Sequence, residues 1–210
     1  MSAKVRPLIA PARRPRRDSY DDDGAAEPLI SSGKIAILML IASEMMLFSG
    51  LIGPFFVYKG EAPFWPPPGL PRLPIFVTWI NTFVLIASGA TMYLGVRAVH
   101  QNRQRLLRRW LATTAALGTA FLAVQGSEWV RLVARGLKLS SGTYGATFYT
   151  LIGLHGAHVT AAVVWLAFVV VAAVRGKYNS KNAGGVEICA MYWYFVCAIW
   201  PLLFVLVYLT

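Results

Sequence analysis

The chain has 210 residues, a formal net charge of +11 and a 57% share of hydrophobic residues. Charged residues make up only 14% of it, against about 25% in soluble domains, which excludes an ordinary soluble protein. The basic residues gather in short clusters at the ends of apolar segments. Membrane proteins carry their orientation signals in this way, so the positive charge argues against a nucleic-acid-binding protein.

The first 33 residues are polar and rich in proline. A basic block runs from Arg13 to Arg17 and is followed by an acidic run from Asp21 to Asp23. Because so few apolar residues cannot form a core, we expect residues 1–33 to be a disordered tail. A secretory signal is the alternative, but the apolar segment that follows is too long for one and no small-residue cleavage site ends it.

Five apolar segments follow, each close to the roughly 20 residues that a helix needs to cross a bilayer. They predict an all-α fold, a bundle of five transmembrane helices in one domain at 34–210. The expected helices cover residues 34–58, 75–98, 109–132, 145–174 and 187–209. With the N-terminus inside, fifteen Lys and Arg residues fall on the inner side and five on the outer side. The positive-inside rule therefore predicts that the N-terminus lies inside and the C-terminus outside.

Small and polar residues recur at helical spacing on the second and third predicted helices. Thr78, Asn81 and Ser88 share one face of the second, while Gln125 and Glu128 share one face of the third. Such residues let helices approach one another and hydrogen-bond across the contact. We interpret the residues of the second helix as packing contacts.

Glu44 lies about ten residues into the first predicted helix, roughly 15 Å deep and close to the bilayer midplane. An ionised carboxylate there costs several kcal/mol, and no Lys or Arg lies near it in the same helix. We expect the side chain to be neutral, or hydrogen-bonded to a neighbouring helix or subunit. Two interpretations stay open: a protonated packing residue, or a carboxyl on a proton route or beside a lipid-filled cleft.

His155 and His158 lie three residues apart on the fourth predicted helix, so both can face one neighbour. Zinc, copper or haem iron would need further ligands, and the remaining histidine, His100, lies in a basic loop. We therefore predict no metal site and no cofactor in this chain. The two histidines are expected to hydrogen-bond Gln125, Glu128 or a lipid headgroup.

Three further features bear on chemistry. Cys189 and Cys197 lie eight residues apart in one helix, about 12 Å along its axis, too far for a disulfide. Arg175 ends the fourth apolar segment, where a cation suits the helix dipole and lipid phosphates. The sequence contains no phosphate-binding loop and no nucleophile–base arrangement, so we predict no catalytic residue and no catalysis by this chain alone.

Six short motifs follow one another in order along residues 34–209. They are Ser43–Leu51, Asn81–Thr82, Gln125–Trp129, Gly142–Phe148, Gly153–Val159 and Tyr192–Trp200. Together they resemble subunit III of the haem-copper cytochrome c and quinol oxidases, in the five-helix form common in bacteria. Each motif is weak alone, but six in register form a strong match.

The resemblance implies an accessory subunit of a proton-pumping terminal oxidase in aerobic respiratory electron transport, in the bacterial cytoplasmic membrane. Haem and copper are then expected in the partner subunits, and phospholipid in a cleft between helices. The implied partners are catalytic subunit I, subunit II and further respiratory subunits. Glu44 matches the family's carbodiimide-reactive carboxyl, thought to support proton uptake and to protect subunit I from turnover inactivation. His158 and Arg175 match positions near bound lipid.

The last helix departs from the family pattern, because Tyr194 and Cys197 stand where the family usually has His and Asp. This puts in doubt the polar network of those residues and indicates a divergent branch. The alternative is a subunit III-like membrane protein associated with nitric oxide reductase, which shares the five helices. A transporter would show broken helices and repeat symmetry, which this sequence lacks.

Overall fold

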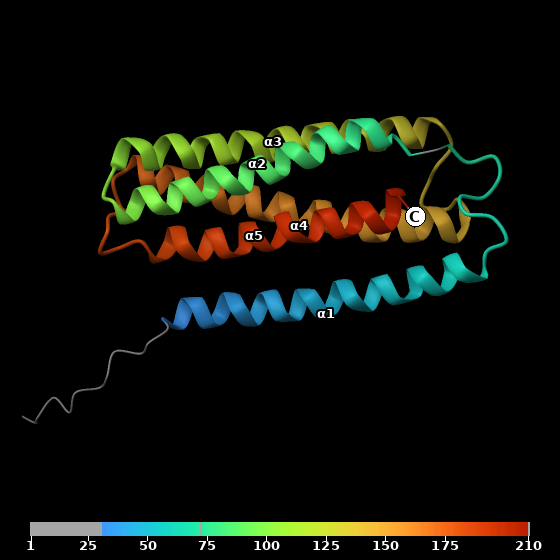
Figure 1. Ribbon diagram of the computed structural model, residues 1–210, viewed down its shortest axis with the longest axis horizontal. Helices are drawn as coiled ribbons and strands as arrows, with labels where there is room; N and C mark the ends of the chain where they lie inside the picture. The colour runs from blue at the N-terminus through green and yellow to red at the C-terminus, as the bar shows by residue number, and fades with distance from the viewer. Residues whose placement is uncertain (1–30, 72, 210) are drawn as a thin grey trace, which may run out of the picture. The chain divides into compact units, whose positions relative to one another are not determined.

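The computed structural model describes residues 31–71 and 73–209, and in these ranges the chain is all-helical (Figure 1). The helices are α1 (Ser32–Glu61), α2 (Ile75–His100), α3 (Gln104–Ala134), α4 (Gly142–Val174), α5 (Gly184–Phe204) and a short π-helix, η1 (Val205–Leu209). The expected disordered tail lies almost entirely outside the described residues. α1 begins at Ser32, just inside that expected tail.

All five predicted helices are present, and most extend beyond the apolar segments that predicted them. α3 begins at Gln104 rather than at 109, because Arg, Gln and Leu are good helix formers whether or not they are apolar. Long basic side chains at a helix end can also extend to water while their stems cover apolar surface. The apolar segments of the sequence therefore predicted the centres of the helices more accurately than their ends.

Four helical segments are long and apolar enough to cross a membrane: α1, α2, α4 and the run from α5 through η1. α3 is of similar length, but threonine, glycine and glutamine make its centre less apolar, and it is not among the four. An all-α fold with four apolar helices of membrane-spanning length is thereby confirmed.

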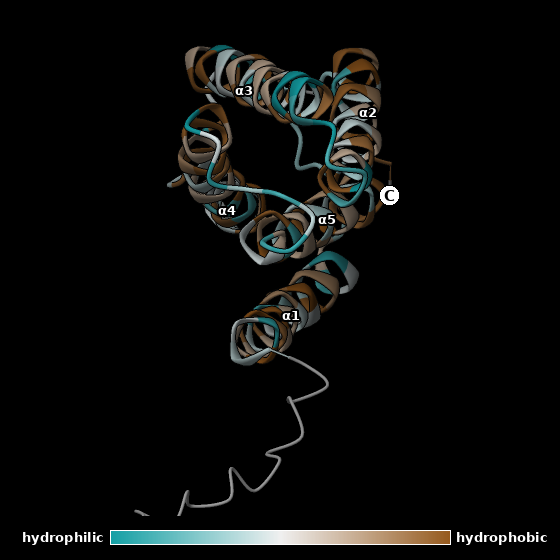
Figure 2. Ribbon diagram, turned by 90° about the vertical axis from the view of Figure 1, so that its left-hand side faces the viewer, coloured by the Kyte–Doolittle hydropathy of each residue, from teal (hydrophilic) through white to brown (hydrophobic). Residues whose placement is uncertain are grey.

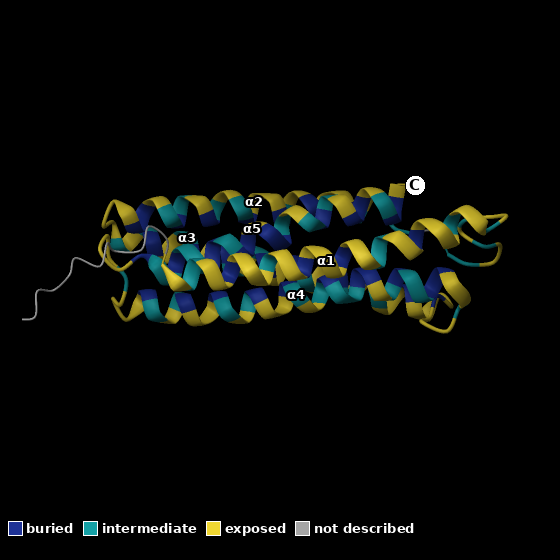
Figure 3. Ribbon diagram, turned by 90° about the horizontal axis from the view of Figure 1, so that it is seen from below, coloured by how far each residue is buried: buried dark blue, intermediate teal, exposed yellow. Residues whose placement is uncertain are grey.

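Helices α2, α3, α4 and α5 form a ring, in which each contacts the next and α5 closes against α2 (Figure 2). α1 lies outside this ring and makes limited contact with α4 and α5. Much of its surface is exposed and apolar, with Met39, Met46 and Val57 as examples (Figure 3). α1 is thus the helix whose position depends most on a few specific contacts.

The centre of the ring is filled by large aromatic side chains. Trp193 of α5 is fully buried and lies against Gly118 of α3, where a Cβ atom would overlap the indole ring. The Trp193 Nε1–H donates a hydrogen bond of 3.2 Å to Ser88 Oγ of α2. One side chain therefore joins three helices.

The polar face of α2 provides the hydrogen bonds that hold the ring together. Asn81 Nδ2 donates to the Phe121 carbonyl oxygen of α3 at 3.1 Å, and Trp200 Nε1 of α5 donates to Thr82 Oγ1 at 2.9 Å. In an apolar environment, polar groups on facing helices satisfy one another in this way. The packing role predicted for this face is confirmed for Asn81 and Ser88.

Side-chain contacts at both ends of the bundle hold α1. At one end Glu187 of α5 forms ion pairs with Lys34 of α1 and with His100 of α2, whose Nε2 lies 3.0 Å from Glu187 Oε1. At the other end the Trp65 ring contacts Phe55 of α1 and Tyr144 of α4, with centroid distances of 5.7 and 4.9 Å.

We predict that Gly118→Ala lowers the stability of the bundle by about 1–3 kcal/mol, because the new methyl group must displace the buried Trp193 ring. Gly126→Ala is the matched control on the same helix, since nothing lies within 4 Å of a Cβ there. The midpoint of thermal unfolding in detergent would measure both variants. Equal midpoints for Gly118→Ala and Gly126→Ala would contradict the role given to this contact.

Candidate functional site

Glu44 lies in the middle of α1 and faces the ring, with only 9% of its surface exposed. Its Oε1 accepts a hydrogen bond of 3.2 Å from the Tyr192 hydroxyl of α5 and lies 3.6 Å from Nε2 of His158 on α4. Its Oε2 has no hydrogen-bond partner among the described residues. Three helices therefore bring together a carboxyl, a phenol and an imidazole, which we call the carboxyl cluster.

The backbone of α4 defines the tautomer of His158. Its Nδ1 lies 2.7 Å from the carbonyl oxygen of Leu154. Because a carbonyl oxygen only accepts hydrogen bonds, this contact requires a proton on Nδ1. In the neutral ring Nε2 then carries the lone pair, and it is Nε2 that faces Glu44.

This arrangement suits one further proton shared by Glu44 and His158. With the proton on the carboxyl, both groups are neutral; with the proton on Nε2, a carboxylate faces an imidazolium. The pair has no net charge in either form, so the proton can move between them without leaving an isolated buried charge. The separation of 3.6 Å is too long for a direct hydrogen bond, so transfer needs a small side-chain movement or a bridging water.

Phe48, one turn from Glu44 on α1, closes the carboxyl cluster on one side. Its ring is buried, and its centroid lies 5.4 Å from that of His158 and 6.5 Å from that of His155. The Phe48 ring therefore contacts both imidazoles. The two histidines therefore face the same region, as predicted, but have different surroundings.

His155 is only 1% exposed and lies within the aromatic core. Its ring stacks on Trp200 with a centroid distance of 5.1 Å and an interplanar angle of 27°, and the centroid of the Phe121 ring lies 6.4 Å away. Neither ring nitrogen has a hydrogen-bond partner in the described part of the chain. The predicted hydrogen bond from His155 to α3 is therefore wrong.

The two polar residues of α3 that were expected to bond the histidines have other partners. Gln125 Nε2 donates to the Tyr208 hydroxyl of η1 at 3.1 Å, and Glu128 Oε1 pairs with Arg131 Nη1 at 2.7 Å. Both lie toward the end of α3 that η1 and Arg131 can reach, whereas the ring of Trp200 covers His155. Gln125 and Glu128 are thus packing residues at one end of the bundle, outside the carboxyl cluster.

The remaining sequence predictions concern Arg175 and the cysteines. Arg175 is the C-cap residue of α4, as expected, and it is exposed. Both cysteines are free thiols. Cys197 Sγ lies 3.8 Å from Ser88 Oγ, which places a weakly polar thiol against the polar face of α2.

Tyr192 is the residue of the carboxyl cluster that sequence reasoning missed. It lies in the run Tyr192–Phe195, whose four aromatic residues are typical of helix packing. The available signal was the hydroxyl itself, since a buried tyrosine in an apolar helix usually finds a hydrogen-bond partner. A lone intramembrane carboxyl is the partner such a hydroxyl fits best.

A groove of about 440 Å³ lies between α1 and α4. Leu51, Pro54 and Tyr58 line it from α1, while Thr147 and Leu151 are among the α4 residues that line it. Leu51 lies seven residues from Glu44, on the same face of α1 and about 10 Å along its axis. The groove therefore approaches the carboxyl cluster from one end of the bundle.

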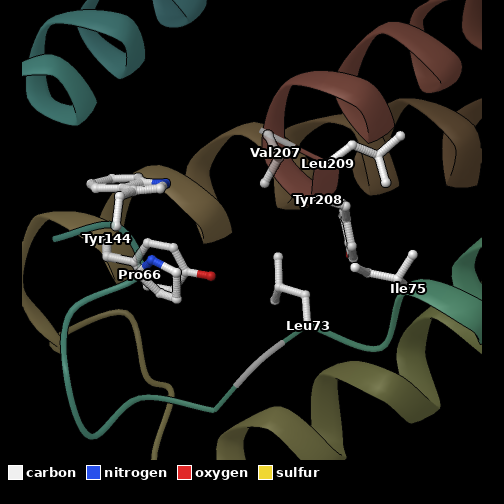
Figure 4. Close-up of a pocket in the computed structure, with 8 residues that line it drawn as sticks. Pro66, Leu73, Ile75, Tyr144, Val207, Tyr208 and Leu209 are labelled. Atoms are coloured by element: carbon white, nitrogen blue, oxygen red, sulfur yellow. The ribbon is translucent and has the colours of Figure 1, made fainter.

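A second cavity, of about 300 Å³, lies under the loop that joins α1 to α2. Figure 4 shows Pro66 and Leu73 of that loop together with Tyr144 of α4 and Tyr208 of η1 around it. Its lining contains neither a carboxylate nor an imidazole. We therefore place the candidate site at the carboxyl cluster and not here.

Within residues 31–71 and 73–209, no three His, Cys, Asp or Glu side chains gather closely enough to hold a metal ion. Glu44 and His158 supply two such groups, and Tyr192 completes their surroundings with a hydroxyl. The carboxyl cluster therefore consists of a carboxyl group, an imidazole and a phenolic hydroxyl.

A family profile and three individual relatives agree on the family that this chain matches. The profile of the family "Cytochrome c oxidase subunit III" matches residues 21–210. Cytochrome c oxidase subunit 3 of Synechocystis sp. is 34% identical over 174 residues, 82% of this chain and 73% of that protein. The corresponding protein of Thermostichus vulcanus is 34% identical over 176 residues, 83% and 86% of the two chains. That of Oryctolagus cuniculus is 30% identical over 193 residues, 88% and 72%.

We predict that Tyr192→Phe raises the reactivity of Glu44 toward a carbodiimide, because the carboxyl loses the hydrogen bond of 3.2 Å that the phenol donates to it. A hydrogen bond to a charged group contributes about 1.5–3 kcal/mol. Labelling of Glu44 by a hydrophobic carbodiimide, which reacts with protonated carboxyls, would measure this by peptide mass spectrometry. Tyr194→Phe is the control, since Tyr194 is 37% exposed. Equal labelling of the two variants would exclude a role for the Tyr192 hydroxyl.

Proposed function

The chain belongs to the cytochrome c oxidase subunit III family, which makes it an accessory subunit of a haem-copper oxidase, and from this we propose that its carboxyl cluster holds a proton for the oxidase. The observation that carries the proposal is the burial of Glu44 against Tyr192 and His158 in the middle of an apolar helix. The nitric oxide reductase alternative is not favoured, because the matching family and the three relatives above are all cytochrome c oxidase subunits.

The protein is a multi-pass membrane protein, and we propose that all five long helices cross the membrane. α3 lies alongside α2 and α4 in the ring (Figures 1 and 2), so it would cross together with them. Thr114, Gly118 and Gln125 of α3 are buried against the other helices. Thr119, at the centre of α3, is exposed and donates to the Ala115 carbonyl oxygen of its own helix. Burial of the first three residues accounts for part of the lower hydropathy of α3.

The charge distribution supports an orientation with the N-terminus inside. The start of α1, the α2–α3 turn and the α4–α5 loop lie at one end of the bundle (Figure 1). That end carries Lys34, Arg97, Arg103, Arg105, Arg108, Arg109, Arg175, Lys177 and Lys181. The opposite end carries Lys59, Arg131, Arg135 and Lys138 among the described residues. By the positive-inside rule the first end is cytoplasmic, which in a bacterial inner membrane is the side of proton uptake.

In the proposed mechanism Glu44 and His158 share one proton and Tyr192 stabilises the form in which Glu44 is ionised. The carboxyl holds the proton, the imidazole accepts it at Nε2, and the phenol donates a hydrogen bond to the carboxylate. Phe48 excludes lipid from one side, which preserves the low dielectric that makes these interactions strong. The cluster would supply or buffer protons for the catalytic subunit and would stabilise that subunit during turnover.

We also propose that a phospholipid acyl chain occupies the groove between α1 and α4. Its lining is largely apolar, with threonine hydroxyls along α4, and α1 and α4 make only limited direct contact. A lipid there would complete the packing of α1 and restrict water access to Glu44. His158 and Arg175 are not among the groove residues, and Arg175 would remain a candidate for a headgroup at the cytoplasmic end.

The catalytic cofactors are proposed to lie in the partners. Haem and copper need sets of His or Cys ligands, which the described residues do not bring together. Subunit I would carry haem and copper, and subunit II would be a further neighbour. The exposed apolar surfaces of α1 and α2 are the surfaces available for such contacts.

Isolation of the chain in a mild detergent should recover a complex with haem absorbance, a large many-helix subunit and a copper-binding partner. An optical spectrum and mass spectrometry of the same sample would measure this, and the haem type would identify the class of oxidase. Recovery with a nitric oxide reductase subunit instead would overturn the assignment.

We predict that Glu44→Gln leaves assembly of the complex nearly unchanged but lowers proton-pumping efficiency or the number of turnovers before inactivation. The amide keeps the size of the side chain and can still accept from Tyr192, but it cannot carry an exchangeable acid proton. Glu61→Gln, at the exposed end of α1, is the control. Proton release per electron in reconstituted vesicles and activity over time would be recorded. Loss of assembly in Glu44→Gln alone would favour the packing interpretation.

A further inference from the structure

The turn between α2 and α3 and the helix ends beside it concentrate arginine in a stretch of sequence without acidic residues. From Leu94 to Thr113 the chain contains no Asp or Glu, and its arginines are Arg97, Arg103, Arg105, Arg108 and Arg109. Among them, Arg108 donates through Nε to the Ala173 carbonyl oxygen at 3.2 Å. The described ion pairs include none of the five.

The acidic side chain nearest in the fold is already neutralised. Glu187, at the start of α5, pairs with Lys34 through one carboxylate oxygen and with His100 through the other. Among the described residues, Glu187 is the single Asp or Glu at this end of the bundle. The positive charge of the α2–α3 turn is therefore left for a ligand from outside the bundle.

Backbone hydrogen bonds and buried apolar residues define the short connection between α2 and α3. Asn102 takes a left-handed conformation with φ of 56°, and the Arg103 backbone N–H donates to the Ala98 carbonyl oxygen at 2.9 Å. Val99 and Leu107, on either side of the connection, are fully buried. The side chains of Arg97 and Arg103 are exposed beside it.

A cavity of about 270 Å³ opens beside this connection. Arg97, Gln101 and Arg103 form its polar wall, while Leu106 and Trp110 contribute to its apolar wall. An adjoining hollow of about 170 Å³ shares Leu106 and Trp110. The two hollows form one surface that is cationic at the end of the bundle and apolar toward its centre.

The adjoining hollow adds a third cation. Arg109 and Thr113 line it beside Trp110, one helical turn apart on α3. A hydroxyl and a guanidinium at this position extend the polar surface along the helix. The arrangement fits an elongated amphiphile better than a small free anion, because a small anion would make no favourable contact with the apolar wall.

We propose that this surface, formed by the two hollows, binds an anionic phospholipid through its headgroup. The guanidinium groups of Arg97 and Arg103 would donate to the phosphate oxygens, and Gln101 would bond a headgroup hydroxyl. Leu106 and Trp110 would contact the glycerol and the first methylenes of the acyl chains. A zwitterionic lipid is disfavoured because its ammonium group finds no carboxylate among the lining residues and meets three arginines.

This site differs from the groove between α1 and α4 in both place and chemistry. The groove residues include no Lys or Arg, so it selects for acyl chains, whereas the α2–α3 surface selects for headgroup charge. The inference rests on the proposed membrane location and not on the role of Glu44. A bound anionic lipid would connect α2 and α3 to the cytoplasmic leaflet.

The test is native mass spectrometry of the intact oxidase complex in micelles that contain equal amounts of phosphatidylglycerol and phosphatidylethanolamine. The variant Arg97→Gln/Arg103→Gln should retain about one phosphatidylglycerol fewer per chain than the unmodified protein. Arg105→Gln, on the same turn but outside the cavity lining, should retain the full number. Retention of phosphatidylethanolamine should be the same in all three proteins.

Equal phosphatidylglycerol retention in the double variant and the unmodified protein would overturn the proposal. Displacement of the lipid by millimolar inorganic phosphate would overturn it as well, since the surface would then be a simple anion site. The readout is a lipid count and not oxidase turnover. A chain that keeps its lipid but is isolated without oxidase partners would refute the proposed function while leaving this site in place.

Discussion

The burial of one carboxyl in the middle of an apolar helix is the constraint on which the position of α1 depends. In a bilayer, hydrophobicity gives no helix a preferred rotation, because lipid tails are as apolar as the side chains they replace. Apolar residues occur all around α1, and Glu44 is the buried polar residue on the face that also buries Ile37, Phe48 and Phe55. The hydroxyl of Tyr192 and the ring of His158 then define both the rotation of α1 and its height against α4 and α5.

Polar contacts within apolar surroundings also hold the four-helix ring together. Trp193 and Trp200 each bring a polar atom into the ring, and a small or polar residue on another helix accommodates it. Trp193 combines the space left by Gly118 with the hydroxyl of Ser88, and Trp200 finds Thr82. Packing and hydrogen bonding are therefore satisfied by the same few contacts, which accounts for the small and polar residues spaced along α2 and α3.

The sequence predicted the helices because apolar length is a strong signal, and it predicted Glu44 because a lone carboxyl in hydrocarbon is rare. It did not predict Tyr192 as its partner, since a tyrosine within an aromatic run looks like packing until the rotation of both helices is known. The surroundings of His155 were missed for the same reason: stacking on Trp200 depends on how α4 and α5 face each other. The π-helical end of α5 and the early start of α3 have no distinctive sequence pattern.

The limited contact of α1 with the ring has a mechanical consequence. Its two ends are held by the Glu187 ion pairs and by Trp65, while its middle is held mainly through Glu44. A sideways displacement of α1 that is large enough to break a hydrogen bond would separate the carboxyl from both of its partners. The carboxyl cluster would therefore open and close with the bending of a single helix.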